Sequence, residues 1–251
     1  LTMAYNVTGL TAYVEERRLP LIAEAVLKAK SASLFNLQTD VKGSAAINLV
    51  NTDPTFQEGG CGWNAQGDVT FSQRIINTGL VKINMAFCEK DLLKTWMGYE
   101  VKAGLADDSL AFEEYFIGHI IDKVKANVEK AIWQGDKDSE DTTLSHTDGL
   151  IKILNAAAGV VKPTVAEGSS AYDAIKAVYM AIPEKVLDKA VILVGADTFR
   201  AYMQEMVEKN FYHYSADGMP SEEFIMPGTN TKVIAVNGLN ETGVIVASAL
   251  D

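Results

Sequence analysis

Residues 131–154 read AIWQGDKDSEDTTLSHTDGLIKIL, and this stretch decides the fold class. Its first four residues close a run of helical hydrophobic spacing, and Gly135 follows them as a residue that commonly ends helices. A polar connection then leads to Asp148, Gly149 and Leu150, where apolar residues again recur at helical spacing. The stretch therefore predicts a long helix that stops before Gly135 and a second helix that opens near Leu150.

The helix before this connection is predicted to cover residues 109–134. Acidic residues surround its first turn, where they complement the positive end of the helix dipole. At 1.5 Å per residue its length would be about 39 Å, roughly twice that of an average globular helix. The predicted buried face is formed by Ile117, Ile120, Ile121, Val124, Val128, Ala131 and Ile132.

Upstream, residues 39–87 change to the alternating pattern of β-strands. Pro54 and a glycine cluster, comprising Gly59, Gly60, Gly62 and Gly67, separate two apolar arms. We predict a long β loop with a glycine-rich tip, whose second arm continues through Val81, Ile83 and Met85. A two-stranded loop is at best marginally stable alone, so its apolar side needs a cover. That predicted apolar side includes Ile47, Leu49, Val69 and Phe71.

The remaining segments predict further helices and short strands. Helices are expected at 19–32, at 89–97, at 174–182 after a Ser170–Asp173 capping signal, and after a cap at Asp197. The last of these helices carries Phe199, Tyr202, Met203, Met206 and Val207 on one face. Strands are expected at 190–194, 232–236 and 244–247, with Asn237-Gly238 beginning a turn between the last two.

Composition limits the classes of function. The chain has 22 Lys+Arg against 33 Asp+Glu, a formal net charge of −11, which argues against nucleic-acid binding as its main function. Arg17, Arg18, Lys28 and Lys30 make the amino-terminal region locally basic; an arm contacting an acidic neighbour or packaged DNA explains this as well as an exposed helix face does. No apolar run is long enough to span a bilayer, and no secretory signal is expected.

The reactive residue types form no recognisable catalytic or metal-binding motif. Cys61 and Cys88 match neither a metal knuckle nor a redox pair, so two free thiols are expected. His119, His146 and His213 have no second histidine at ligand spacing. His146 with Asp148 could be a base and its orienting carboxylate, but no nucleophile motif accompanies them, which favours a solvated loop histidine.

Three further groups have a structural explanation that we favour over a functional one. Gly59-Gly60-Cys61-Gly62 lacks the phosphate-binding spacings and predicts a hairpin tip. The acidic run of Asp136, Asp138, Glu140 and Asp141 could bind a cation, but its spacing fails the calcium-loop pattern. Met203 and Met206 could line an adaptable binding groove, but packing in the core is the interpretation that we favour. No catalytic residue, cofactor site or metal site is therefore predicted.

Three short motifs in order give the chain a family resemblance. They are Trp133-Gln134-Gly135-Asp136, Asp148-Gly149-Leu150-Ile151, and Met226-Pro227-Gly228 before 232–239. Over nearly its whole length the chain resembles the tailed-phage major capsid proteins of the Hong Kong 97 type. The resemblance implies an α+β fold with an amino-terminal arm and helix at 1–38, an extended β-hairpin loop at 39–88, a peripheral domain with a spine helix at 89–142, an axial α/β domain at 143–230 and returning strands at 231–251.

The same resemblance implies a structural virion protein that is not an enzyme and needs no cofactor. Such a subunit, encoded by a phage or prophage, would assemble in the bacterial host cytoplasm into an icosahedral shell around phage DNA. Its partners would be copies of itself in hexamers and pentamers, with scaffold, portal or decoration proteins as additional ones, non-specific contact with packaged DNA and no membrane. The extended loop would lie across the adjacent subunit. Lys42 is the only lysine of the outgoing arm, where some relatives crosslink, but no partner constellation supports that chemistry here.

Two alternatives stay open. An encapsulin-type nanocompartment would use the same kind of shell subunit, and co-purifying cargo would favour it. An α/β enzyme would place its site near His146 or at the carboxyl end of the strand at 190–194.

Overall fold

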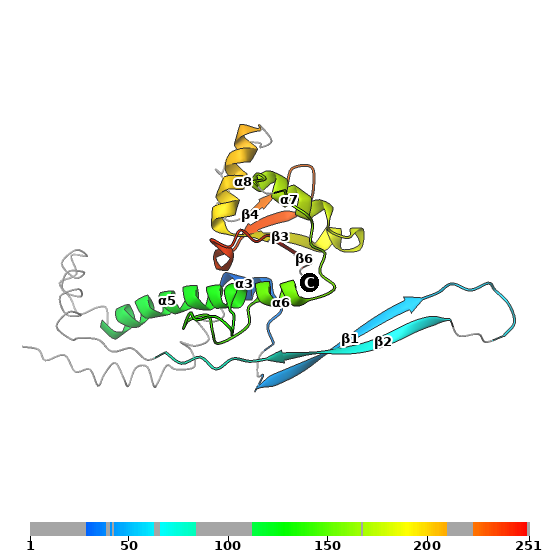
Figure 1. Ribbon diagram of the computed structural model, residues 1–251, viewed down its shortest axis with the longest axis horizontal. Coiled ribbons are helices and arrows are strands. Elements are labelled where there is room, and N and C mark those ends of the chain that lie inside the picture. Colours follow the sequence, from blue (N-terminus) through cyan, green and yellow to red (C-terminus); the bar gives the residue numbers. More distant parts are fainter. Residues whose placement is uncertain are drawn as a thin grey trace, which may run out of the picture. The chain divides into compact units, whose positions relative to one another are not determined.

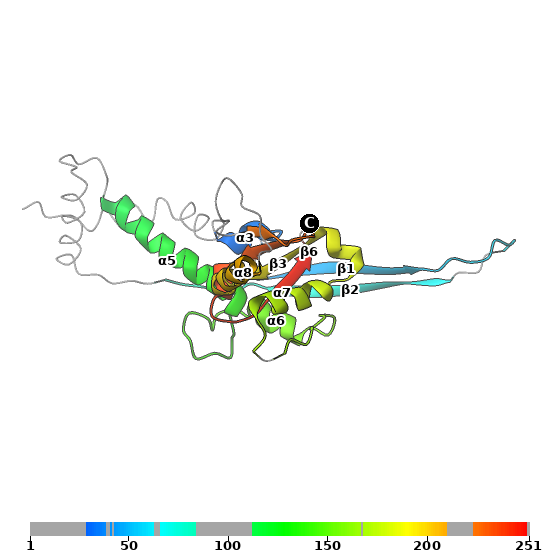
Figure 2. The same ribbon diagram turned by 90° about the horizontal axis from the view of Figure 1, so that it is seen from above.

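The computed structural model describes residues 29–38, 41, 43–62, 66–83, 112–166, 168–209 and 223–249, and of 112–116 the backbone only. These residues form a mixture of helices and strands, so the general class is α+β, as predicted. The chain divides into two compact units. We call Leu37–Lys82 the ribbon, and Leu1–Asn36 with Ile83–Asp251 the body (Figures 1 and 2).

The ribbon consists of two antiparallel strands of equal length, β1 (Ser44–Pro54) and β2 (Gly67–Asn77). Their register runs without interruption from Ser44 opposite Asn77 to Pro54 opposite Gly67. The predicted continuation of the second arm is wrong where it can be examined, because residues 78–83 are not strand. Met85 lies outside the described residues.

The body contains a four-stranded sheet in the order β4-β5-β3-β6. Strands β3, β4 and β6 are labelled in Figure 1. Its strands are β3 (Ala190–Val194), β4 (Glu223–Ile225), β5 (Lys232–Ala235) and β6 (Val246–Ala249). β3 pairs parallel with β5 and antiparallel with β6, so the last two strands are not neighbours. The chain does turn at the predicted Asn237-Gly238, where the 3-10 helix η2 (Asn237–Leu239) follows β5. This turn does not close a hairpin, because the chain returns on the far side of β3.

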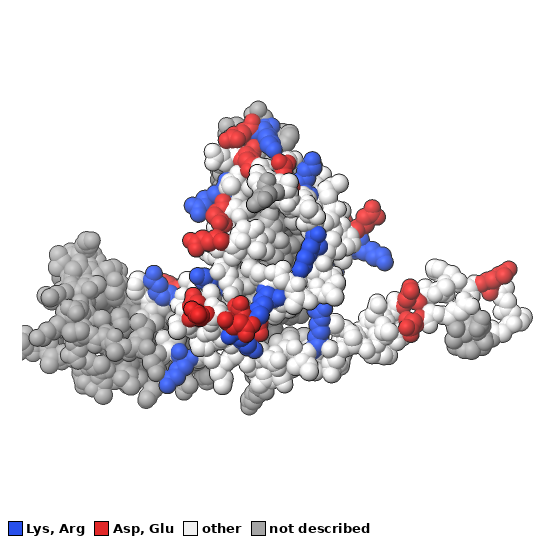
Figure 3. Space-filling model, viewed as in Figure 1, with Lys and Arg blue, Asp and Glu red and all other residues white. Residues whose placement is uncertain are grey.

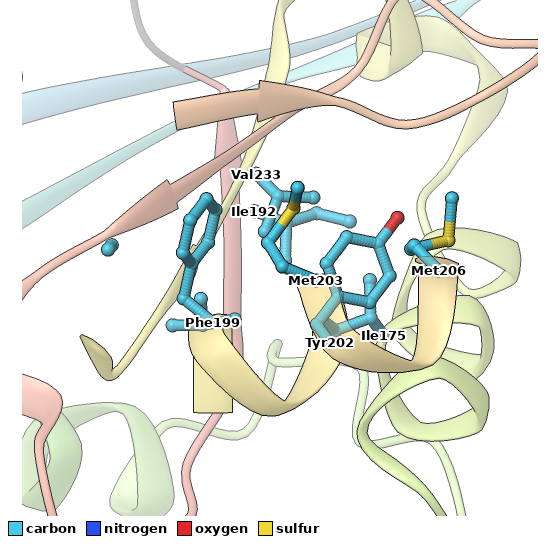
Figure 4. Packing of buried hydrophobic residues seen from close by; sticks show 9 residues of the cluster. Ile175, Ile192, Phe199, Tyr202, Met203, Met206 and Val233 are labelled. Carbon is cyan, nitrogen blue, oxygen red and sulfur yellow. The ribbon is translucent and has the colours of Figure 1, made fainter. Parts of the chain in front are cut away.

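Two helices cover one face of this sheet. They are α7 (Ala171–Met180) and α8 (Ala196–Glu208), joined through the 3-10 helix η1 (Glu184–Lys189) and β3. Figure 4 shows their buried side chains against the strands. The cluster comprises Ile175, Ile192, Val194, Phe199, Tyr202, Met203, Met206, Val233 and Ala235. The core role predicted for Met203 and Met206 is confirmed, whereas Val207 is exposed.

The opposite face of the sheet packs against a second set of helices. These are α3 (Lys30–Leu34), the end of α5 (Phe112–Gln134) and α6 (Leu150–Ala156). The buried cluster on this side of the sheet comprises Trp133, Leu193, Ile234, Val236 and Leu239. Because alternate strand residues enter the two clusters, β3 and β5 are buried on both sides, which explains their continuous apolar sequence.

Helix boundaries follow from local capping. Ser170 accepts a hydrogen bond from the Asp173 backbone N–H, as predicted, and α7 therefore starts at Ala171 instead of residue 174. Asp197 lies within the first turn of α8, and Gly195 holds the cap position instead.

Two predicted helices, at 19–32 and 109–134, lie only partly within the described residues. The prediction of a helix through residue 29 is wrong, because Ala29 is extended and α3 begins after it. Residues 19–28, 89–97 and 109–111 lie outside the described residues. Among the helices that the structure describes, none combines the length and the apolarity that a membrane crossing requires.

Candidate interaction surface

The register of the ribbon assigns each strand residue to one of two faces, because directly opposed residues in an antiparallel pair project to the same side. A hydrogen bond of 2.9 Å from the Gln73 amide to the Asn48 side-chain oxygen joins one such pair. The face with this pair, the uncharged face, comprises Ser44, Ala46, Asn48, Val50, Thr52, Pro54, Gly67, Val69, Phe71, Gln73, Ile75 and Asn77. The other, the charged face, comprises Ala45, Ile47, Leu49, Asn51, Asp53, Asp68, Thr70, Ser72, Arg74 and Ile76.

Both faces expose large apolar side chains. On the uncharged face, Val50, Val69, Phe71 and Ile75 are 52–77% exposed. On the charged face, Ile47, Leu49 and Ile76 are 39–48% exposed. The prediction that Ile47, Leu49, Val69 and Phe71 share one side is therefore wrong: the pairing places the first two opposite Arg74 and Ser72, and the other two opposite Thr52 and Val50.

All ionisable side chains of the two strands lie on one face. Arg74 is paired with Ile47, and Asp53 is directly opposite Asp68, an arrangement of like charges that is unfavourable within an isolated ribbon. In the view of Figure 3 most of the ribbon surface is white, with acidic side chains towards its loop end. The uncharged face therefore differs from the other in electrostatics as well as in apolar exposure.

The described residues of the loop that joins the strands, 55–62 and 66, are exposed. Gly59, Gly60 and Gly62 have open space where a Cβ would lie, and Cys61 is an exposed free thiol. This agrees with the predicted hairpin tip. Cys88 and Lys42 lie outside the described residues.

A buried polar cluster in the body was not anticipated from the sequence. The Ser31 hydroxyl donates to the Glu129 carboxylate at 2.5 Å and accepts from the Trp133 indole N–H at 2.6 Å. The Ser31 backbone N–H also donates to this carboxylate, at 3.1 Å. Glu129 is 4% exposed and the other two residues are fully buried, so α3 and α5 are joined by a satisfied buried network.

Two glycines, Gly135 and Gly149, stand at the start and at the end of the connection that follows α5. The Gly149 N–H donates to the Gly135 carbonyl oxygen at 2.7 Å. A Cβ on Gly135 would lie 2.6 Å from the Ala131 carbonyl oxygen, and one on Gly149 would lie 2.5 Å from the Trp133 carbonyl oxygen. The chain therefore returns to the end of α5 at a distance that only glycine permits.

The acidic run contacts a lysine of the same chain. Lys152 is within 2.5 Å of Asp136, 2.6 Å of Asp138 and 2.9 Å of Asp148. Hydrogen bonds from this ammonium, and then from backbone N–H groups, hold the pKa of Asp136 and Asp148 below the usual value. The same contacts, that with Asp136 first, raise the pKa of Lys152. Asp136 and Asp138 thus already have a cationic partner, and no metal-binding cluster occurs among the described residues.

The enzyme alternative places its site near His146 or at the carboxyl end of β3. The Asp148 carboxylate, the suggested partner of His146, contacts Lys137 and Lys152. His146 is exposed in the loop before α6, His119 is exposed on α5, and His213 lies outside the described residues. At the carboxyl end of β3, the Asn240 side-chain oxygen accepts the Ala196 N–H at 2.7 Å, and the Asp197 carboxylate accepts the Glu241 N–H at 3.1 Å.

The pKa of Asp197 reflects its structural contacts. Although partial burial alone would raise this pKa, hydrogen bonds from backbone N–H groups, first that of Thr198 and then that of Glu241, hold it below its usual value. Both polar side chains at this strand end, those of Asp197 and Asn240, thus bind backbone groups of the loop and helix that meet here.

The body also has an apolar groove of about 540 Å³ between α6, α7 and β6. Its lining includes Ile151, Val161, Val178 and Ile245, and its one ionisable residue, Lys162, donates to the Asn155 carbonyl oxygen at 2.9 Å. The lining therefore contains no acid–base pair.

Comparisons of the chain with protein-family models, with curated proteins and with solved structures found no match.

Proposed function

We propose that this chain is the subunit of a self-assembling shell, and specifically a major capsid protein of the Hong Kong 97 type. The observation that carries the proposal is the ribbon, whose strands expose large apolar side chains on both faces. Single exposed apolar residues are common on monomeric proteins, but a contiguous apolar patch usually marks a contact site. A two-stranded ribbon is also marginal in water unless another surface packs on it.

A second line of support is the order of the described elements. The ribbon strands at 44–77 precede the long helix α5, which ends at Trp-Gln-Gly-Asp, and the sheet with its covering helices follows. This is the order that the family resemblance implies. Within the proposal, residues 39–88 are the extended loop, 89–142 the peripheral domain with its spine helix, and 143–230 the axial domain.

The acidic charge is consistent with a structural container. With 33 acidic against 22 basic side chains, the subunit would repel DNA overall, so any non-specific contact with packaged DNA would be weak. Its main partners would be copies of itself, in hexamers and pentamers, in a virion capsid assembled in the bacterial host cytoplasm. An encapsulin-type shell is the alternative within this class, and no described feature of the chain favours it over a capsid.

The proposal is tested by measuring the mass and shape of the purified chain. Size-exclusion chromatography with light scattering, followed by negative-stain electron microscopy, should show closed particles many times heavier than 27.2 kDa. A variant that lacks residues 59–67 should keep the folded body and lose the particles, because the deletion removes the glycine-rich tip and most of the loop that joins β1 to β2. A wild-type chain that is monomeric throughout, or particles unchanged by the deletion, would contradict the proposal.

A further inference from the structure

The two faces of the ribbon do not offer equivalent contact surfaces. The uncharged face has Val50, Val69, Phe71 and Ile75 as its apolar residues, and the Asn48–Gln73 hydrogen bond satisfies two of its polar side chains. The charged face would bring the opposed carboxylates of Asp53 and Asp68 into any contact made there. Desolvating unpaired carboxylates is costly, so close packing on this face would be unfavourable.

We infer that the ribbon docks by its uncharged face on a second copy of this chain, leaving the charged face outward. This inference rests on the proposed function and deepens it. The occupant follows from the proposed self-assembly, and the net charge of −11 then favours this face, since two acidic copies repel each other and a contact face without ionisable side chains adds no further repulsion. A nucleic acid is a poorer occupant, because the face has no cationic side chain to meet phosphate.

The size of the face indicates how the contact is used. With 11 residues per strand, it measures about 36 Å by roughly 10 Å, or on the order of 350 Å². A stable pairwise interface needs about 800 Å² from each partner. One ribbon contact is therefore too small to hold an isolated pair. In a closed ring each copy gives one ribbon and receives another, which doubles the contacts that each copy makes.

Adjacent residues on each strand give a matched experiment. Val50→Asp and Phe71→Asp place a charge on the uncharged face, whereas Leu49→Asp and Ser72→Asp place it on the charged face. All four positions are exposed in the chain, so each variant should keep the wild-type far-UV circular dichroism. We expect the first pair to lower particle yield by at least about tenfold, because burying an unpaired carboxylate costs more than the ~1.4 kcal/mol of one decade. The second pair should assemble within about twofold of wild type, because charges left in water cost little.

Each result decides the inference. Loss of particles in Leu49→Asp and Ser72→Asp alone would overturn the choice of face while leaving the proposed function intact. Equal yield in all four variants would remove the ribbon faces from the contact. If the wild-type chain is monomeric and Val50→Asp lowers its melting temperature, the face packs on its own body, and both the inference and the proposed function fail.

Discussion

Ser31→Ala is the substitution for which the structure gives the most definite magnitude. It removes one hydroxyl from a fully buried position, and with it the acceptor of the Trp133 indole N–H and one donor to the Glu129 carboxylate. The backbone N–H of residue 31 still donates to the Glu129 carboxylate, so this buried charge keeps a hydrogen bond. A buried polar group left without its partner costs about 1–3 kcal/mol. With two groups affected, we expect the free energy of unfolding to fall by roughly 2–4 kcal/mol.

The measurement is urea denaturation followed by circular dichroism, with thermal melts in parallel. For a chain of this length, the expected loss corresponds to a melting temperature lower by roughly 5–15 °C. Ser33→Ala is the matched control, because that hydroxyl is exposed and bonds only the Lys30 carbonyl oxygen within its own helix. We expect the control to change stability by less than about 0.5 kcal/mol. If Ser31→Ala were as stable as Ser33→Ala, the buried network would not join α3 to α5.

Two other substitutions test the body independently of assembly. Lys152→Met should destabilise the fold at neutral pH. The pKa values of Asp136 and Asp148 are lowered in the folded wild-type chain, so the stability that their ion contacts contribute is present above the reference pKa of 3.8. That stability is lost as the pH falls through the pKa values of the folded state. The difference in melting temperature between Lys152→Met and wild type should therefore shrink in acid, and a constant difference across pH would contradict the ion contacts. Tyr202→Phe should leave stability unchanged or raise it by up to about 1 kcal/mol, since the buried hydroxyl has no hydrogen-bond partner in the described structure and burial raises its pKa to about 12. A clear drop in its melting temperature would mean that this hydroxyl is bonded after all.

The local signals in the sequence predicted the end of α5, the start of α6 and the buried strand β3. Each of these depends on residues close together, such as Gly135 directly after a helical run. The contact between Lys152 and Asp148 joins the first turn of α6 to the residue before its N-cap, only four positions away, and could have been predicted from the sequence. By contrast, Ser31 lies 102 residues from Trp133 in the chain, and nothing near either residue indicates that they meet.

The faces of the ribbon could not be predicted from the sequence. Alternation identified both strands, but the face of a residue on β1 relative to one on β2 depends on the register, and a shift of one residue exchanges the faces. For this reason Ile47 and Phe71 were wrongly placed together. The pairing of β5 and β6 could not be predicted for a related reason. The Asn237-Gly238 turn signal is local, whereas the position of β3 between the two strands depends on residues far away in the sequence.

We propose above all that the exposed apolar side chains on the uncharged face of the ribbon find their cover on an identical molecule. A cryo-electron-microscopy reconstruction of the purified particles tests it most directly, since it locates residues 44–77 of each copy. We expect a closed shell in which Val50 and Phe71 of one copy lie against the surface of the next. A reconstruction in which the body of the same chain covers these side chains, with no ribbon reaching a neighbour, would contradict the claim.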